Sequence, residues 1–243
     1  MGKIDFVQFQ SADVLADAAA REWINTLPST GPHYVAFSGG RIAEKFFDAI
    51  TTIAREHNLS LAQIHFFWAD ERCVPPDHPE SNYRLMRTRL LQPLSIPEAQ
   101  VHRIKGELEP AAAAREASLE LGRVANGVLD FVFLGMGEDG HVASIFPGDP
   151  LAESVTEYYR PVFAAPKPPS RRVTLAMHTM VAARNVSVLV SGLGKEDAQG
   201  KSLDSGSTTP LARLLQKRHL TKVLSDIRPK QPTIKHFQRA EEI

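Results

Sequence analysis

The chain has 243 residues, 43% of them hydrophobic and 23% charged, which is typical of a globular protein with a hydrophobic core and excludes disordered and fibrous chains. Its 28 basic and 28 acidic side chains cancel to a formal net charge of zero, so no overall field attracts nucleic acid or an anionic membrane. The single cysteine, Cys73, favours a reducing compartment, and the sequence shows neither a signal-like N-terminus nor an apolar run of transmembrane length. We therefore expect a cytoplasmic protein without nucleic-acid or membrane partners.

Apolar runs rich in β-branched and aromatic residues alternate with segments of helical periodicity. The expected strands are residues 4–9, 33–37, 64–68, 101–104, 129–134, 173–175, 186–190 and 222–225. The expected helices are residues 12–27, 42–57, 83–91, 110–124 and 195–203, and Ser11 is the expected N-cap of the first.

This alternation predicts an α/β fold. Strands such as FVFL and SVLV are apolar on both faces, which suits a parallel sheet covered by helices on both sides. We expect a three-layer, doubly wound, mostly parallel sheet in one domain spanning residues 1–243. The polar, basic stretch from Ile227 onward is expected to form a surface arm or an extra helix at the edge of the sheet.

In open parallel sheets ligands bind beyond the carboxyl ends of the strands. The first such place is Ser38-Gly39-Gly40-Arg41, between an expected strand and an expected helix. The glycines allow close approach of a ligand, the helix N-terminus supplies unpaired amides, and Ser38 and Arg41 add a hydroxyl and a cation. This combination indicates a phosphate site, although the same residues would also suit a tight strand-to-helix turn that binds no ligand.

The second place is Asp70-Glu71-Arg72, which follows the strand IHFFW. Adjacent opposite charges at a strand end suit either an active site or a structural cluster of salt bridges. A metal site formed by Asp70, Glu71 and His78 is a weaker alternative, because the spacing matches no defined site.

The third place is the segment LGMGEDGHVASIFPG, residues 134–148. Its glycines fit the dinucleotide pattern G-x-G-x-x-G formally, but Glu138 and Asp139 would lie where a pyrophosphate should bind. A glycine-shaped loop that presents His141 beside Asp139, a base and its orienting carboxylate, explains the residues better.

The fourth place combines PKPPSRRVT, which contains Lys167, Arg171 and Arg172, with Lys195 in SGLGKE. Prolines stiffen the first segment, so its cations could clamp an anion, although solvated surface charge is the simpler interpretation. Lys195 is the stronger candidate because glycines hold it near the end of a buried strand.

Together these segments resemble the family of 6-phosphogluconolactonases and glucosamine-6-phosphate isomerases/deaminases. The resemblance rests on SGG at residues 38–40, WADER at 68–72, SNYRLMRTRLL at 81–91, LGMGEDGHVASIFPG at 134–148, PKPPSRRVT at 166–174 and SGLGKE at 191–196. It implies hydrolysis of 6-phospho-D-glucono-1,5-lactone, the second step of the oxidative pentose phosphate pathway, without metal or cofactor. As partners we expect a small sugar phosphate as substrate, and a monomer or small homo-oligomer.

The resemblance also implies roles for individual residues. His141 would be the general base, Asp139 would orient it, and Arg72 would stabilise the developing oxyanion. The substrate phosphate would be held by Ser38, Gly39, Gly40 and Lys195, with Arg41 and Arg172 as helpers.

The chain departs from the family pattern in one loop, which often has SGGSTP or SGGTTP, whereas Arg41, Ile42 and Ala43 follow the glycines here. The deaminase branch usually has DEY where this chain has DER, and Arg72 would place a cation in the lactonase position. Three other functions stay possible as hypotheses. They are a deaminase, a non-catalytic sugar-phosphate-binding protein and, from the glycine pattern alone, a dinucleotide oxidoreductase.

Overall fold

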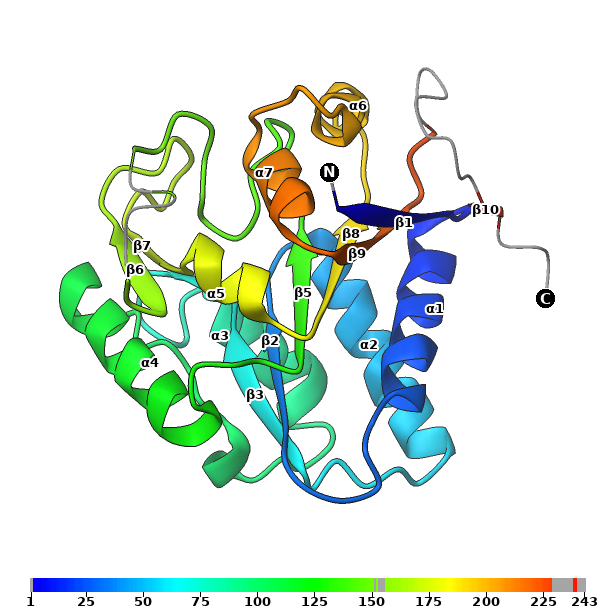
Figure 1. Cartoon of the computed structure of the whole chain (residues 1–243). Coiled ribbons are helices and arrows are strands. Elements are labelled where there is room, and N and C mark those ends of the chain that lie inside the picture. Colours follow the sequence, from blue (N-terminus) through cyan, green and yellow to red (C-terminus); the bar gives the residue numbers. More distant parts are fainter. Residues whose placement is uncertain (1, 151, 153–155, 229–237, 240–243) are drawn as a thin grey trace.

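The computed structural model describes residues 2–150, 152, 156–228 and 238–239 (Figure 1). Seven parallel strands form the main sheet in the order β10-β1-β9-β8-β5-β2-β3. Their bounds are β1 Lys3–Gln8, β2 His33–Phe37, β3 Ile64–Trp68, β5 Phe131–Gly135, β8 Asn185–Val190, β9 Leu220–Ser225 and β10 Gln238–Arg239. The predicted parallel sheet is confirmed.

Helices cover both faces of this sheet. Their bounds are α1 Ala12–Asn25, α2 Arg41–Glu56, α3 Asn82–Met86, α4 Pro110–Ala125, α5 Met177–Ala182, α6 Glu196–Leu203 and α7 Pro210–Lys217. Helices α1 and α2 pack against each other on one face, and α4, α5 and α7 lie on the other (Figure 1). The predicted three-layer architecture is therefore confirmed, and the Val14 N–H donates to Ser11 Oγ at 3.3 Å as expected for its N-cap.

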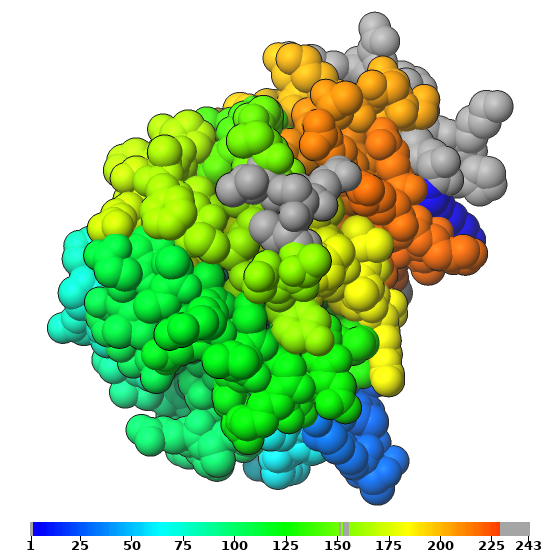
Figure 2. All heavy atoms as spheres, turned by 60° about the vertical axis from the view of Figure 1, so that its left-hand side comes forward, coloured from blue at the N-terminus to red at the C-terminus, as the bar shows by residue number. Residues whose placement is uncertain are grey.

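A second sheet was not expected. The antiparallel strands β4 (Asp70–Arg72), β7 (Arg172–Leu175) and β6 (Tyr159–Val162) form a small sheet in the order β4-β7-β6. Helix α4 packs against β6 and β7. In Figure 2 the green surface of α4 lies next to the yellow-green surface of the segments around these strands. The strand predicted at 173–175 thus belongs to the small sheet, which places the PKPPSRR segment next to Asp70-Glu71-Arg72.

The prediction of a strand at residues 101–104 is wrong. Val101 makes only an isolated parallel bridge to Phe66, and the His102 N–H donates to the Phe66 carbonyl at 2.9 Å. The His102 side chain then bonds Glu120 of α4 at 2.8 Å, and the chain turns back at Gly106 against the backbone of Arg72. These contacts take the segment away from the sheet edge before a ladder can form.

The predicted helix at 83–91 changes character along its length. It begins as the short helix α3 and continues as a π-helical turn at Arg87–Leu91. At the C-terminus, Gln238 and Arg239 pair with β1 rather than forming a helix, and the rest of the expected arm, residues 229–237 and 240–243, lies outside the described residues. Within the described part, no helix is long and apolar enough to cross a membrane.

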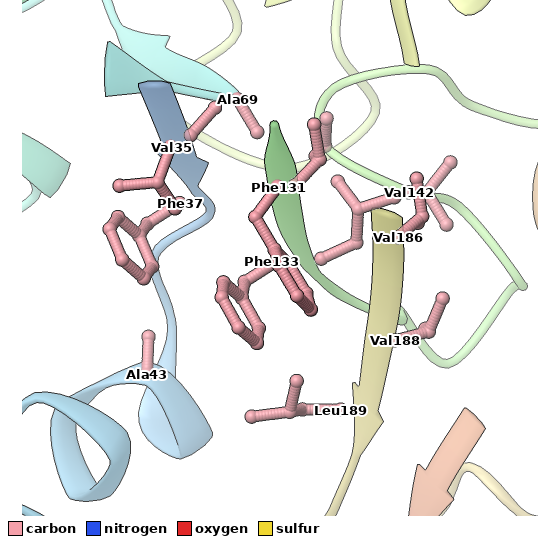
Figure 3. Packing of buried hydrophobic residues seen from close by; sticks show 14 of the residues in the cluster. Val35, Phe37, Ala43, Ala69, Phe131, Phe133, Val142, Val186, Val188 and Leu189 are labelled. Carbon is pink, nitrogen blue, oxygen red and sulfur yellow. The ribbon is translucent and has the colours of Figure 1, made fainter. Parts of the chain in front are cut away.

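Aromatic side chains from neighbouring strands form the centre of the core. Figure 3 shows Phe37 of β2 beside Phe131 and Phe133 of β5. The Phe133 ring stacks on Phe37 with centroids 5.3 Å apart and on Phe131 with centroids 4.4 Å apart. Because alternate residues of a strand share a face, Val132 and Leu134 cover the opposite face of β5, and both faces are buried as FVFL predicted. This packing holds the carboxyl ends of β2 and β5 together.

We expect Phe133→Ala to lower the free energy of unfolding by about 3–5 kcal/mol, because it removes a buried ring that stacks on two others. Urea or guanidinium unfolding measures the change. Leu119→Ala, at a side chain 67% exposed on α4, is the control and should change stability little. Equal losses in the two variants would contradict this description of the core.

Candidate active site

A pocket of about 310 Å³ opens at the carboxyl ends of β2, β5 and β8. Eight of the predicted site residues line it: Ser38, Gly39, Gly40, Arg41, Arg72, His141, Arg172 and Lys195. The ninth, Asp139, bonds the lining residue His141. Residues far apart in the sequence thus meet at the carboxyl ends of the strands, where the parallel topology predicted a ligand site.

The loop after β2 is built to receive an anion. Gly40 is the N-cap of α2 with φ of 101°, a conformation that favours glycine, and no side chain caps the first amides of the helix. Ser38 Oγ is buried and has no hydrogen-bond partner among the described residues. Unpaired amides at the N-terminus of a 16-residue helix, together with an unpartnered hydroxyl, provide donors for phosphate oxygens.

Two cations adjoin this loop. The Arg41 guanidinium lies beside Gly192, and Lys195 follows on the same loop as the N-cap of α6. Burial lowers the pKa of Lys195, and the charge of Arg41 lowers it further. Two neighbouring cations repel each other, so an anion bound between them would stabilise both.

His141 is held by its neighbours in a fixed orientation. Its Nδ1 lies 2.5 Å from Asp139 Oδ1, and its ring packs on Phe146 with centroids 4.6 Å apart. A Cβ at position 137 would come within 2.0 Å of the imidazole, so only glycine leaves room for the ring. With Nδ1 engaged by the carboxylate, Nε2 is the nitrogen free to act as a base.

Burial lowers the pKa of His141, and the Asp139 carboxylate opposes this effect. Although burial of Asp139 acts in the other direction, its contact with His141 lowers the pKa of the carboxyl. At neutral pH the pair is therefore a neutral imidazole beside a carboxylate, the state in which a histidine can accept a proton.

Fixed guanidinium groups mark another part of the pocket. Arg72 Nη1 donates to the Glu80 carbonyl at 2.8 Å and to the Glu80 carboxylate at 3.2 Å. Arg172 donates from Nε to the Pro169 carbonyl at 2.8 Å and from Nη2 to the Lys167 carbonyl at 2.9 Å. Burial lowers the pKa of Arg172, and the nearby Asp70 carboxylate opposes this.

In the Asp70-Glu71-Arg72 segment, two side chains face the pocket and the third is buried. Asp70 and Arg72 line the pocket, and Asp70 accepts a hydrogen bond from Ser144 Oγ at 2.7 Å. Glu71 is instead buried beneath the segment that follows, where its carboxylate accepts four hydrogen bonds. Their donors are the backbone N–H groups of Arg72, Asn82 and Tyr83 and the Ser81 hydroxyl, at 2.7 to 3.0 Å. Burial raises the pKa of Glu71 to about 7 against the effect of these donors.

The metal alternative at Asp70, Glu71 and His78 finds no support in this geometry. A cation would have to displace the four donors that occupy Glu71, and His78 Nδ1 already accepts the Glu80 N–H at 3.1 Å. Within the described ranges, no cluster of three or more His, Cys, Asp or Glu side chains is arranged to hold a metal ion.

Several lining residues were not predicted as site residues: Asp70, Asn82, Glu138, Lys167 and Ser191. All five stand in segments that the sequence analysis quoted, but no role was assigned to them there. Asn82 is held at the pocket by the Glu71 carboxylate, which accepts its backbone N–H, and by its own side chain, which donates to the Asp70 carbonyl at 2.9 Å. Arg171 lies elsewhere, paired with Glu109 at 2.6 Å.

We expect a proton NMR titration to place the His141 pKa below that of an ordinary histidine. Asp139→Asn should lower it further, because the substitution removes the charge that stabilises the imidazolium. An unchanged or higher His141 pKa in this variant would show that Asp139 does not act on the ring electrostatically.

Comparison with known proteins supports the resemblance. The sequence profile described as glucosamine-6-phosphate isomerases/6-phosphogluconolactonase matches residues 8–224. The 6-phosphogluconolactonase of Homo sapiens is 36% identical over 194 residues, 78% of this chain and 75% of its own. That of Haemophilus influenzae is 31% identical over 212 residues, 87% of this chain and 89% of its own.

Solved structures agree with these relatives. The crystal structure of a devB protein superposes with a TM-score of 0.82 at 28% identity, covering 92% of this chain and 96% of that one. The 6-phosphogluconolactonase of Trypanosoma brucei gives 0.77 at 27% identity, covering 93% and 97%. A monomeric glucosamine-6-phosphate deaminase, at 20% identity and a TM-score of 0.79, shares the fold. The chain belongs to the glucosamine-6-phosphate isomerase/6-phosphogluconolactonase family.

Proposed function

We propose that this protein hydrolyses 6-phospho-D-glucono-1,5-lactone to 6-phosphogluconate. The observation that carries the proposal is the His141–Asp139 pair in the same pocket as the anion-binding loop at Ser38–Gly40. A base for activating water and a site for a phosphate are the two requirements of this substrate. The relatives named as lactonases support the same reaction.

In the proposed mechanism, His141 Nε2 removes a proton from water as the water oxygen bonds to the lactone carbonyl carbon. Negative charge develops on the carbonyl oxygen, and the Arg72 guanidinium, fixed by Glu80, stabilises it. The bond between this carbon and the ring oxygen then breaks, and His141 returns the proton to the departing oxygen. Asp139 stabilises the imidazolium that exists between the two proton transfers.

The phosphate is proposed to bind the backbone of Gly39 and Gly40 and the first amides of α2. Ser38 Oγ and the cations of Lys195 and Arg41 are proposed as further ligands. Binding at one end positions the lactone carbon at the other end, near His141. Arg172 as a further phosphate ligand stays a prediction. Its charged neighbours are Asp70, Arg72 and Glu80, which indicates that its charge acts near the sugar.

Residue 72 distinguishes the two branches of the family. The deaminase branch that the sequence resembles usually carries a tyrosine there, whereas the guanidinium in this pocket suits an oxyanion. The solved deaminase is only 20% identical to this chain, so that comparison shows a common fold and carries no argument about the reaction. We further propose a reducing, cytoplasmic setting, since Cys73 has no second cysteine to pair with in the chain, and a monomer or small homo-oligomer.

The reaction can be tested by generating the lactone in situ from glucose 6-phosphate and comparing its decay with and without the protein. We expect acceleration above the spontaneous rate for the phosphorylated lactone and little or none for unphosphorylated gluconolactone. No acceleration, with deamination of glucosamine 6-phosphate instead, would assign the protein to the other branch. Binding of sugar phosphates without either reaction would indicate a non-catalytic protein.

Substitutions should separate the two ends of the pocket. His141→Ala should lower kcat by roughly 10²–10⁴-fold, the usual contribution of a positioned acid or base, while the Kd for 6-phosphogluconate changes little. Lys195→Ala should mainly raise KM. Steady-state kinetics and calorimetry measure both, and wild-type turnover in His141→Ala would refute the mechanism.

The pH dependence follows from the lowered His141 pKa. The base must be neutral, so activity should persist somewhat below the ordinary histidine pKa and fall at lower pH as His141 becomes protonated. Asp139→Asn should shift this acidic limb of kcat/KM to still lower pH. A shift to higher pH would contradict the assigned role of Asp139.

A further inference from the structure

Lys167 and Glu138 face each other across the pocket. Lys167 Nζ lies 3.4 Å from Glu138 Oε2, and both residues line the pocket. They come from different loops, one between β5 and His141 and the other between β6 and β7. Their side chains are 47% and 54% exposed, so the pair is weak and can be broken at little cost in free energy.

The backbone of Lys167 is fixed while its side chain is not. The Lys167 carbonyl accepts the Arg172 Nη2 hydrogen bond at 2.9 Å, and prolines 166 and 168 flank the residue. Beyond this anchored backbone, a flexible four-carbon side chain carries the ammonium group. Lys167 can therefore exchange partners without movement of the loop.

The other cations near His141 lack this freedom. Arg72 is bonded to Glu80, and Arg172 is bonded to backbone carbonyls. The Lys167 carbonyl is bonded to Arg172, whose guanidinium lies over the Phe146 ring that packs on His141, so the Lys167 side chain starts near the proposed site of reaction. Its charge lowers the pKa of both His141 and Lys195, so the ammonium lies between the two ends of the pocket.

The Glu138 side chain is also less constrained than the other carboxylates of the pocket. Asp139 is bonded to His141, and Asp70 is bonded to Ser144. The hydrogen bond to Lys167 is the one that the structure gives the Glu138 side chain within its described part. The carboxylate is thus a resting partner for Lys167.

Hydrolysis changes the charge at this position. Water adds to the carbonyl carbon, the bond to the ring oxygen breaks, one proton goes to that oxygen, and the resulting acid loses its other proton to solvent. The product therefore carries one more negative charge than the lactone. Resting on the function proposed above, we propose that Lys167 leaves Glu138 to bind the carboxylate of the product, and that Glu138, by competing for Lys167, weakens the product complex.

Calorimetry with two ligands tests this exchange. The ligands are 6-phosphogluconate and glucitol 6-phosphate, which has the same phosphate but no carboxylate. Glu138→Gln should tighten 6-phosphogluconate up to about fivefold, the upper range for an exposed ion pair. Lys167→Met should weaken it by a similar factor. The affinity for glucitol 6-phosphate should change much less, because Glu138 and Lys167 reach the phosphate end only through their long-range effect on Lys195. Glu138→Gln should have little further effect on 6-phosphogluconate once Lys167 is methionine.

A matched control pair lies on the surface away from the pocket. Lys105 and Glu116 are 2.7 Å apart with side chains 51% and 45% exposed, so Lys105→Met and Glu116→Gln make the same changes of charge elsewhere. Both should leave both affinities unchanged.

Equal shifts for the two ligands would overturn the inference, because they would place Lys167 at the phosphate. An effect of Glu138→Gln that persists in the Lys167→Met background would overturn it too, since simple repulsion of the product would then suffice. These outcomes leave the proposed function intact. Failure of the unmodified protein to bind either sugar phosphate would contradict the proposed function as well.

Discussion

The parallel register of β2, β5 and β8 is the constraint on which the site depends. Phe37 is paired with Phe133, and Gly135 with Leu189, so the three strands end at nearly the same level. The loops that follow them are the anion-binding loop, the His141 loop and the Lys195 loop, and all three leave the sheet at one edge. The stacked rings of Phe37, Phe131 and Phe133 hold this register from inside the core (Figure 3). Stability and site geometry therefore rest on the same contacts.

The small sheet adds a second group of residues to this edge. Strand β4 continues from β3 after Ala69, and its pairing with β7 places Arg72 directly opposite Arg172. The Ala69 N–H donates to the Phe37 carbonyl at 2.9 Å, and its carbonyl accepts the Leu175 N–H at 2.7 Å, so this one residue joins the two sheets. Beneath them the buried Glu71 carboxylate anchors the backbone at Asn82. The small sheet fixes the backbones of Arg72 and Arg172, and Glu80 and the carbonyls of Lys167 and Pro169 fix their guanidinium groups. The side chains of Lys167 and Glu138 are half-exposed and keep their freedom.

Much of this could be predicted from local sequence. The strands at 33–37 and 64–68 have the predicted bounds because turn residues flank continuous apolar runs. The nine site residues gather because each follows a strand or lies close to one. The strand at 101–104 could not be excluded from its sequence, since it was the long-range bonds of His102 that turned it away. Asn82 and the Glu138–Lys167 pair depend on contacts between distant segments, which carry no local signal. The individual roles of the site residues stay predictions.

A crystal structure of the protein with bound 6-phosphogluconate would test the arrangement most directly. We expect phosphate oxygens at about 2.7–3.2 Å from the first amides of α2 and from Lys195 Nζ. The carboxylate should lie beside His141 and Arg72 at the other end of the ligand. A phosphate bound at Arg72, with the carboxylate on the glycine loop, would reverse the two ends of the pocket and contradict the proposed mechanism.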